Sequence, residues 1–148
     1  SSVKGIEDDI DCFAYFGSGR FHPEGLRTEK PVFIFDTESK EAYDIRLKLR
    51  KHLMKRQLAV EKAKDLGYFL IYLSTKKGQS RPDVAVRVKN HLREKGKKAF
   101  IISADMLTPD KILGIKCDVI VNTACPRLSD DNALFGKVMI NAEDVKDI

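Results

Sequence analysis

Hydrophobic residues form short continuous runs along this chain, and stretches of helical periodicity separate them. The runs predict strands at 12–16, 31–35, 68–73, 99–103 and 118–122, with a last short edge strand at 138–140. The helical stretches are 41–65, 82–95 and a shorter one near 109–113. Runs that are apolar throughout are typical of parallel strands buried on both faces. The pattern therefore predicts an α/β fold with a mostly parallel sheet, right-handed crossovers and helices on both faces.

The stretch 41–65 carries two apolar stripes. The first consists of Ile45, Leu49, Leu53 and Val60, and the second, on nearly the opposite side, of Leu47, Met54 and Leu58. A surface helix of a single domain needs only one stripe, so two stripes predict a helix held between two packed bodies. One broad, irregular apolar face is an alternative. A basic RNA-binding helix is a third option, but the lysines and arginines do not gather on one side.

This helix sets the expected domain organisation. Residues 1–40 are expected to be the C-terminal part of one α/β domain, and 41–65 to form a long bridging helix. Residues 66–148 are expected to be a complete α/β domain. The fold class is thus one complete domain plus part of another. The opening Ser1-Ser2-Val3, without a methionine, fits a fragment.

Composition narrows the class of protein without naming a function. The 148 residues are 43% hydrophobic and 33% charged, as in ordinary globular proteins. No apolar run approaches the roughly 18 residues of a membrane span, and no signal segment opens the chain, so a cytoplasmic protein with no membrane contact is expected. A net charge of +5 would suit RNA, but a lysine-rich solvated surface explains it more simply. Direct nucleic-acid binding is not expected.

Three polar segments directly follow predicted strands, at 17–22, 74–79 and 124–129. Ligands of parallel sheets bind at this edge, where strands end and loops begin, so the three segments predict a site. Gly17 and Gly19 would bring backbone amides near an anion, and Arg20 could bind a carboxylate or phosphate. A plain glycine turn explains this segment about equally well.

The second and third segments offer different chemistry. Residues 75–79 supply a hydroxyl, an ammonium, a flexible glycine and an amide, which suit a carboxylate or a ribose. A solvated loop explains them about as well. In the third segment Cys125 precedes Pro126, whose ring fixes the chain beside the thiol.

The three cysteines are Cys12, Cys117 and Cys125. Their odd number and the absence of a Cys-x-x-Cys pair exclude a self-contained zinc ribbon or ferredoxin site. Cys117 and Cys125 flank a predicted strand, which separates them by roughly 20 Å, so they cannot share a metal. Cys12 and Cys117 are expected to be buried, small apolar residues.

Taken in order, five segments resemble the diphthamide synthase family in its archaeal homodimeric form. They are YFGSGRFHP (15–23), YDIR (43–46), STKKGQ (74–79), TACPRLS (123–129) and NAED (141–144). Members of this family have three similar α/β domains, each giving one cysteine to a central 4Fe–4S cluster. The resemblance implies that this chain is a C-terminal fragment with part of the second domain and all of the third. Its cluster cysteine would be Cys125, and the second one would lie just before Ser1.

The resemblance also implies a reaction. The family transfers the 3-amino-3-carboxypropyl group of S-adenosylmethionine to C2 of a histidine imidazole in elongation factor 2. Cys125 would be a thiolate ligand of the cluster, and no residue is assigned to catalysis. The expected contacts to S-adenosylmethionine are Gly17, Gly19, Arg20, Thr75, Lys76, Gly78, Gln79 and Arg127. Ser18 and Ser74 stand where many relatives have Asp and Gly, which leaves the contacts of both loops open. With one cluster cysteine, this fragment alone is expected to be inactive.

Two other classes of function remain open. One is a free-standing nucleotide- or phosphate-binding α/β module without a cluster, in which Cys125 is incidental. The other is an interaction domain of a larger assembly. Anaerobic reconstitution with iron and sulphide, on a chain extended upstream, separates them. The binding module predicts no cluster absorption, and the interaction domain predicts no binding of S-adenosylmethionine.

Overall fold

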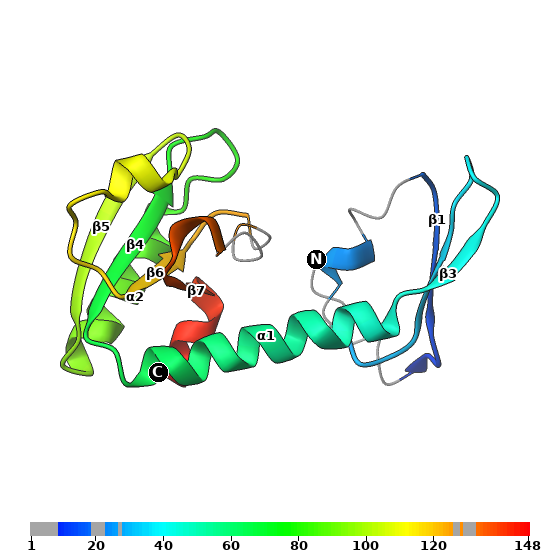
Figure 1. Ribbon diagram of the computed structural model, residues 1–148, viewed down its shortest axis with the longest axis horizontal. Helices are drawn as coiled ribbons and strands as arrows, with labels where there is room; N and C mark the ends of the chain where they lie inside the picture. The colour runs from blue at the N-terminus through cyan, green and yellow to red at the C-terminus, as the bar shows by residue number, and fades with distance from the viewer. Residues whose placement is uncertain (1–8, 19–22, 27, 126–127, 129–132) are drawn as a thin grey trace. The chain divides into compact units, whose positions relative to one another are not determined.

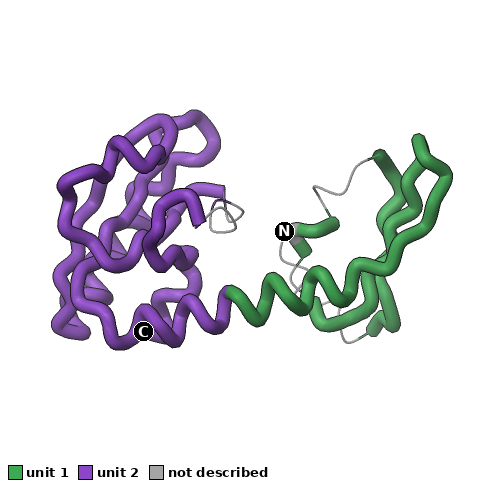
Figure 2. Tube along the Cα trace, in the orientation of Figure 1, with its two compact units in different colours: residues 1–55 green, residues 56–148 purple. Residues whose placement is uncertain are grey.

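The chain divides into two compact units, Ser1–Lys55 and Arg56–Ile148, shown in green and purple in Figure 2. The structure is a computed structural model that describes residues 9–18, 23–26, 28–125, 128 and 133–148. Within these residues, no helix combines the length and the apolar character that a membrane span requires.

The second unit is built on four parallel strands in the order β5-β4-β6-β7. Their bounds are Tyr68–Ser74 for β4, Lys98–Ala104 for β5, Val119–Asn122 for β6 and Val138–Asn141 for β7. Each matches its predicted run to within one residue, and β7 lies at the edge of the sheet as expected. All three pairings are parallel. The α/β class predicted from the apolar runs is therefore confirmed.

Both faces of this sheet are buried. On one face Phe69 and Ile71 pack with Leu92 of α2 (Pro82–Glu94), with the last turns of α1 and with η5 (Ala142–Asp147). On the other face Leu70 packs with Ile112 of the short helix η3 (Pro109–Ile112). The described cover of that second face consists of η3, a 3-10 turn at 133–135 and irregular segments, whereas α-helices cover the first face. Figure 1 shows β4 and β5 side by side with α2 against them.

The first unit contains a smaller, mixed sheet in the order β1-β2-β3. Its strands are β1 (Phe13–Phe16), β2 (Val32–Phe35) and β3 (Ala42–Asp44), and a short helix η2 (Pro23–Gly25) lies between the first two. β1 and β2 are parallel, whereas β2 and β3 are antiparallel.

The strand β3 lies where the sequence predicted the start of the long helix. A carboxylate oxygen of Asp36 accepts hydrogen bonds from the N–H groups of Glu38 (2.9 Å) and Ser39 (3.1 Å), and this turns the chain back. Residues 42–44 then pair with β2. The helix starts only afterwards, so the predicted start at 41 is wrong.

Helix α1 (Arg46–Lys64) contributes to a core in each unit. Near its start, Leu49 packs with Val32 and Ile34 in the first unit. Near its end, Val60 and Ala63 belong to the core of the second unit. Leu49 and Val60 both belong to the first of the two apolar stripes predicted from the sequence.

The second predicted stripe is exposed in the part of the chain that the structure describes. Leu47, Met54 and Leu58 are 76%, 60% and 56% exposed. Among the described residues, the burial that was expected for this second stripe is therefore not found, whereas Leu49 and Val60 of the first stripe are buried.

Candidate functional site

Two of the predicted ligand segments lie at the same edge of the second unit's sheet. Residues 75–79 follow β4, and Cys125 follows β6, which is hydrogen-bonded to β4 in parallel. Because parallel strands end at one edge, the loops that follow them leave the sheet on the same side (Figure 1). The structure thus brings Cys125 and this loop to neighbouring positions along the edge.

In the loop after β4, hydrogen bonds hold the backbone while the side chains are exposed to solvent. The Thr75 N–H donates to the carbonyl oxygen of Ala104 (3.0 Å), and the Gln79 N–H donates to that of Lys76 (3.0 Å). Gly78 has φ +80°, a conformation that side chains disfavour. The side chains of Thr75, Lys76 and Gln79 are exposed, so they are available to a ligand.

The backbone around Cys125 is folded back onto the end of β6. The carbonyl oxygen of Cys125 accepts hydrogen bonds from Asn122 Nδ2 (2.7 Å) and from the Leu128 N–H (3.0 Å). Asn122 Oδ1 accepts the N–H of Ala124 (2.9 Å). Cys125 itself is a free, half-buried thiol. The predicted ligand Arg127 lies outside the described residues.

The same asparagine continues into a polar network. Asn122 Nδ2 also donates to Asn141 Oδ1 (2.9 Å), and the Asn141 N–H donates to Asp144 Oδ2 (3.1 Å). The Asp144 carboxylate accepts hydrogen bonds from Arg56 Nε of helix α1, at 2.7 and 2.9 Å. All four residues belong to the second unit.

Sequence reasoning did not assign a role to any member of this network. In the sequence, Asn141 and Asp144 belong to one of the segments that resemble the family, and Asn122 is the last residue of a predicted strand. A signal was nevertheless present. An asparagine within a fully buried strand needs buried partners, and Asn122 is only 1% exposed.

The other two cysteines differ from each other. Cys12 is exposed and precedes β1, so the expectation that it is buried in the strand is wrong. Cys117 is 3% exposed and lies in the core that contains Leu70 and Ile112, so its predicted burial is confirmed. Burial raises the pKa of the Cys117 thiol, which keeps it protonated and unreactive. Within the described ranges, no three His, Cys, Asp or Glu side chains lie where they could together hold a metal ion.

The remaining glycine segment belongs to the first unit. Gly17 follows β1, and its N–H donates to the carbonyl oxygen of Phe35 (3.2 Å). A Cβ added to Gly17 would lie 2.9 Å from the Tyr15 hydroxyl oxygen, so a larger residue would displace that ring. Gly19 and Arg20 lie outside the described residues.

A pocket of about 420 Å³ lies beside the Cys125 loop, between α2 and η5. Residues 122–124 form part of its wall. Its charged lining consists of Arg81, Arg87, Lys146 and Glu143, with Arg87 paired to Asp83 at 3.0 Å, so positive charge is in excess. The sequence did not predict this pocket. Its charge suits an anionic group.

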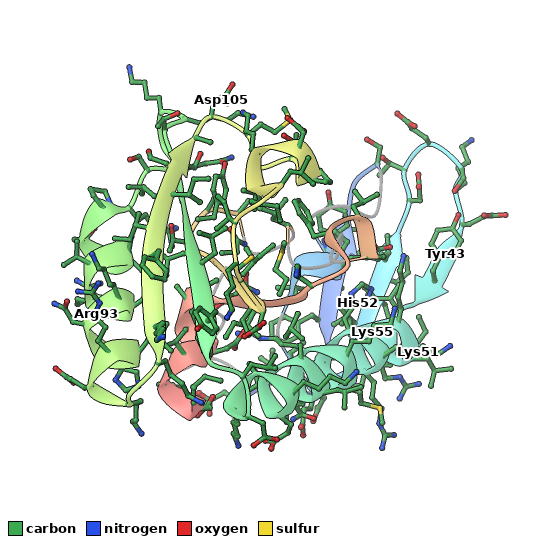
Figure 3. All side chains as sticks on the ribbon, turned by 60° about the vertical axis from the view of Figure 1, so that its left-hand side comes forward. Tyr43, Lys51, His52, Lys55, Arg93 and Asp105 are labelled. Atoms are coloured by element: carbon green, nitrogen blue, oxygen red, sulfur yellow. The ribbon has the colours of Figure 1, made fainter. Side chains whose placement is uncertain are left out.

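The loop after β5 is closed by an exposed ion pair. Asp105, labelled in Figure 3, accepts hydrogen bonds from Lys111 Nζ (2.8 Å) and from the Met106 N–H (2.7 Å). The hydrogen bond from Lys111 lowers the pKa of this carboxyl below its usual value. The pair holds the segment that leads into η3.

Comparison with known proteins establishes the family. The family of putative diphthamide synthesis proteins matches residues 1–146, so the chain belongs to that family. It is 34% identical over 152 aligned positions to the 2-(3-amino-3-carboxypropyl)histidine synthase of Methanocaldococcus jannaschii, covering 97% of this chain and 44% of the relative. The corresponding enzyme of Pyrococcus horikoshii is 32% identical over 135 positions, covering 89% of this chain and 39% of the relative.

A solved structure agrees with the fold. The crystal structure of Dph2 from Pyrococcus horikoshii with a 4Fe–4S cluster aligns with a TM-score of 0.81 at 31% identity. The alignment covers 90% of this chain and 39% of that one. This chain therefore spans about two-fifths of the length of these relatives.

The described residues are suited to provide one thiolate ligand to such a cluster. Cys125 is only half-buried, stands at the carboxyl edge of a parallel sheet and has its backbone held by two hydrogen bonds. Cys117 is enclosed in a core at the other end of β6. Cys125 is thus the cysteine of the second unit that can reach a ligand.

Proposed function

We propose that this chain is part of a 4Fe–4S, S-adenosylmethionine-dependent enzyme, a 2-(3-amino-3-carboxypropyl)histidine synthase. Its protein substrate would be elongation factor 2, modified at C2 of a histidine imidazole in the first step of diphthamide biosynthesis in the cytoplasm. The observation that carries the proposal is the position of Cys125 on a hydrogen-bonded loop at the carboxyl edge of β6, in a chain of this family.

Each part of the site has a proposed task. Cys125 holds one iron of the cluster as a thiolate. The cluster, when bound and reduced, supplies the electron that cleaves the bond between sulphur and the γ-carbon of S-adenosylmethionine. Thr75, Lys76, Gly78 and Gln79 orient its carboxylate or ribose, as do Gly17, Gly19, Arg20 and Arg127. The domain assignment implied by the family resemblance, with residues 66–148 as the third domain, is part of the same proposal.

Replacement of Cys125 tests the proposal most directly. In the full-length protein, Cys125→Ala removes one thiolate, so iron bound after anaerobic reconstitution falls to background and elongation factor 2 is no longer modified. The 148-residue chain, with one suitable thiolate, binds no stable cluster and is inactive. A Cys125→Ala protein that keeps its cluster and its activity contradicts the assignment.

The two other cysteines provide matched controls. Cys12→Ala changes an exposed side chain and leaves stability within about 0.5 kcal/mol of wild type. Cys117→Ala removes a buried sulphur and costs about 1 kcal/mol of folding free energy. Both variants retain the cluster and modify elongation factor 2 in this proposal.

The exposed side of α1 supports association as a homodimer. Leu47, Met54 and Leu58 offer an apolar surface that is exposed in the described part of the chain. Light scattering across a concentration series measures the effect. A mass that rises in the wild-type chain and stays monomeric in Leu58→Glu supports the dimer, and a monomer at all concentrations in the wild type contradicts it.

A free-standing anion-binding module is the second candidate, and the positively charged pocket beside α2 favours it. Calorimetric titration of the 148-residue chain with inorganic phosphate and with S-adenosylmethionine distinguishes the two. Phosphate binding that Arg81→Ala abolishes, together with no iron uptake by the longer protein, would support the module.

A further inference from the structure

A single buried asparagine organises the loop that presents Cys125. Asn122 is 1% exposed, and its Nδ2 donates both protons, one to the carbonyl oxygen of Cys125 (2.7 Å) and one to Asn141 Oδ1 (2.9 Å). Its Oδ1 accepts the Ala124 N–H at 2.9 Å. A buried amide with both ends engaged cannot rotate without leaving polar groups unpaired. The side chain therefore fixes the backbone on either side of the Ala124–Cys125 peptide bond.

The asparagine is itself anchored. Its partner Asn141 is the last residue of β7 and the N-cap of η5, where a capping box joins the Asn141 and Asp144 side chains and backbones reciprocally. Asp144 is 6% exposed and binds Arg56. Arg56 occupies the stripe of α1 that also supplies Leu49 and Val60, which are both buried. The loop is thereby connected to a long helix through four side chains.

We propose that Asn122 is a positioning residue for Cys125, and that the path through Asn141 and Asp144 to Arg56 fixes this position against α1. Metal ligands must be held within about 0.5 Å of their working geometry, and the groups that orient them matter nearly as much as the ligands. The inference deepens the proposed function and rests on it in one respect, namely that the partner of the thiol is an iron–sulphur cluster.

The reactivity of the thiol tests positioning without any cluster. The wild-type chain and its variants are alkylated with iodoacetamide, and each cysteine is followed by mass spectrometry of its own peptide. Rates are compared on the alkaline plateau, where ionisation of the thiol no longer limits them. Cys117, 3% exposed, reports in the same sample whether the fold is intact.

Asn122→Ala is expected to raise the rate at Cys125 about fivefold, because the loop opens more often when its hydrogen bonds are lost. The rate at Cys117 stays unchanged. Asn90→Ala, a replacement of the same type at an exposed position of α2, leaves both rates at the wild-type value. A wild-type rate at Cys125 in Asn122→Ala, with Cys117 protected, overturns the inference.

If Asn122→Ala unfolds the chain, Cys117 reacts as well, and a second variant decides. Asn122→Asp keeps the volume and the oxygen that accepts the Ala124 N–H, but it lacks the two protons of Nδ2. At least about a twofold rise at Cys125 supports positioning. An unchanged rate overturns it.

Reconstitution of the full-length protein separates this inference from the proposed function. Asn122→Ala keeps every cysteine yet is expected to bind the cluster roughly tenfold more weakly, whereas Cys125→Ala binds none. If Cys125→Ala retains the cluster, the proposed function fails while the effect on thiol reactivity stands. If Cys125→Ala loses it and Asn122→Ala binds as tightly as wild type, only the positioning inference fails.

Discussion

Among the described residues, the four-stranded sheet of the second unit has a core on each face, whereas the three-stranded sheet of the first unit has a core on one face. In the second unit Phe69 lies in one core and Leu70 in the other, both almost fully buried. In the first unit Val32 and Ile34 are fully buried, but Phe16 is 70% and Phe35 39% exposed on the opposite face. Strands of similar apolar sequence are thus buried to different extents, because the burial of a strand depends on whether other elements pack on both faces of its sheet.

The exposed aromatic pair makes this difference concrete. The rings of Phe16 and Phe35 stack with centroids 4.7 Å apart and planes 9° apart. They are register partners at the carboxyl ends of β1 and β2, next to Gly17. Their stacking removes some apolar surface from water, but it does not replace the cover that the second unit has on both faces.

The largest expected effect comes from replacing a core phenylalanine in the second unit. Phe69→Ala leaves a cavity at a fully buried position and should lower the free energy of unfolding by about 3–5 kcal/mol. Urea unfolding followed by circular dichroism measures the loss. Phe16→Ala, the matched replacement in the first unit, should change stability by less than about 0.5 kcal/mol. Equal losses in the two variants would show that something covers Phe16 in solution.

The ion pair between α1 and η5 should have the next largest effect. Arg56→Met keeps much of the length of the side chain but leaves the Asp144 carboxylate, 6% exposed, without its guanidinium partner. We expect a loss of about 2 kcal/mol in the unfolding free energy, because a buried charge then lacks its compensation. Arg50→Met, at an exposed position of the same helix, is the control and should be nearly neutral. A neutral Arg56→Met would mean that Asp144 is solvated in the folded protein.

The smallest effect concerns one exposed carboxylate in each unit. Asp44 is bonded to Arg46 in the first unit and Asp105 to Lys111 in the second, and each pairing lowers the pKa of the carboxyl. Such a group stabilises the fold above its ordinary pKa, and the contribution is lost as pH falls through the lowered value. Titration by NMR should find both midpoints below the ordinary value for aspartate. Lys111→Met should raise the midpoint of Asp105 alone, and a shift at Asp44 would reveal coupling between the pairs.

Sequence patterns predicted the described strands of both units, β1 and β2 included, to within one residue, but they missed β3 of the first unit. The apolar runs at 68–73 and 99–103 locate β4 and β5 because these strands are buried on both faces. The strand β3 was missed because 42–44 is short and partly polar, and only the turn at Asp36 and the partner β2 make it a strand. A local sequence pattern predicts a strand well when the strand is buried along its whole length. It fails when pairing with a distant segment determines whether the residues form a strand.

The candidate site shows the same division. The order of strands and loops predicted that Cys125 and the loop after β4 share one edge of the sheet, because both follow parallel strands. The asparagine that shapes the Cys125 loop was not predicted, since its partner Asn141 lies on another strand, 19 residues away. A buried polar residue gives a sequence signal that partners exist, but the fold alone identifies them.

The spacing of Arg56 and Val60 on helix α1 constrains sequence change within the second unit. Val60 belongs to the core of that unit, and Arg56, about one turn earlier on the same side of the helix, binds Asp144 of η5. One residue inserted between them would rotate Arg56 by about 100° relative to Val60 and shift it by about 1.5 Å, which turns its guanidinium away from Asp144. Insertion of a whole turn would restore the direction but would move Arg56 by about 5.4 Å along the axis. Natural variation in the length of α1 should therefore avoid residues 56–60, whereas the loops of the unit can change one residue at a time.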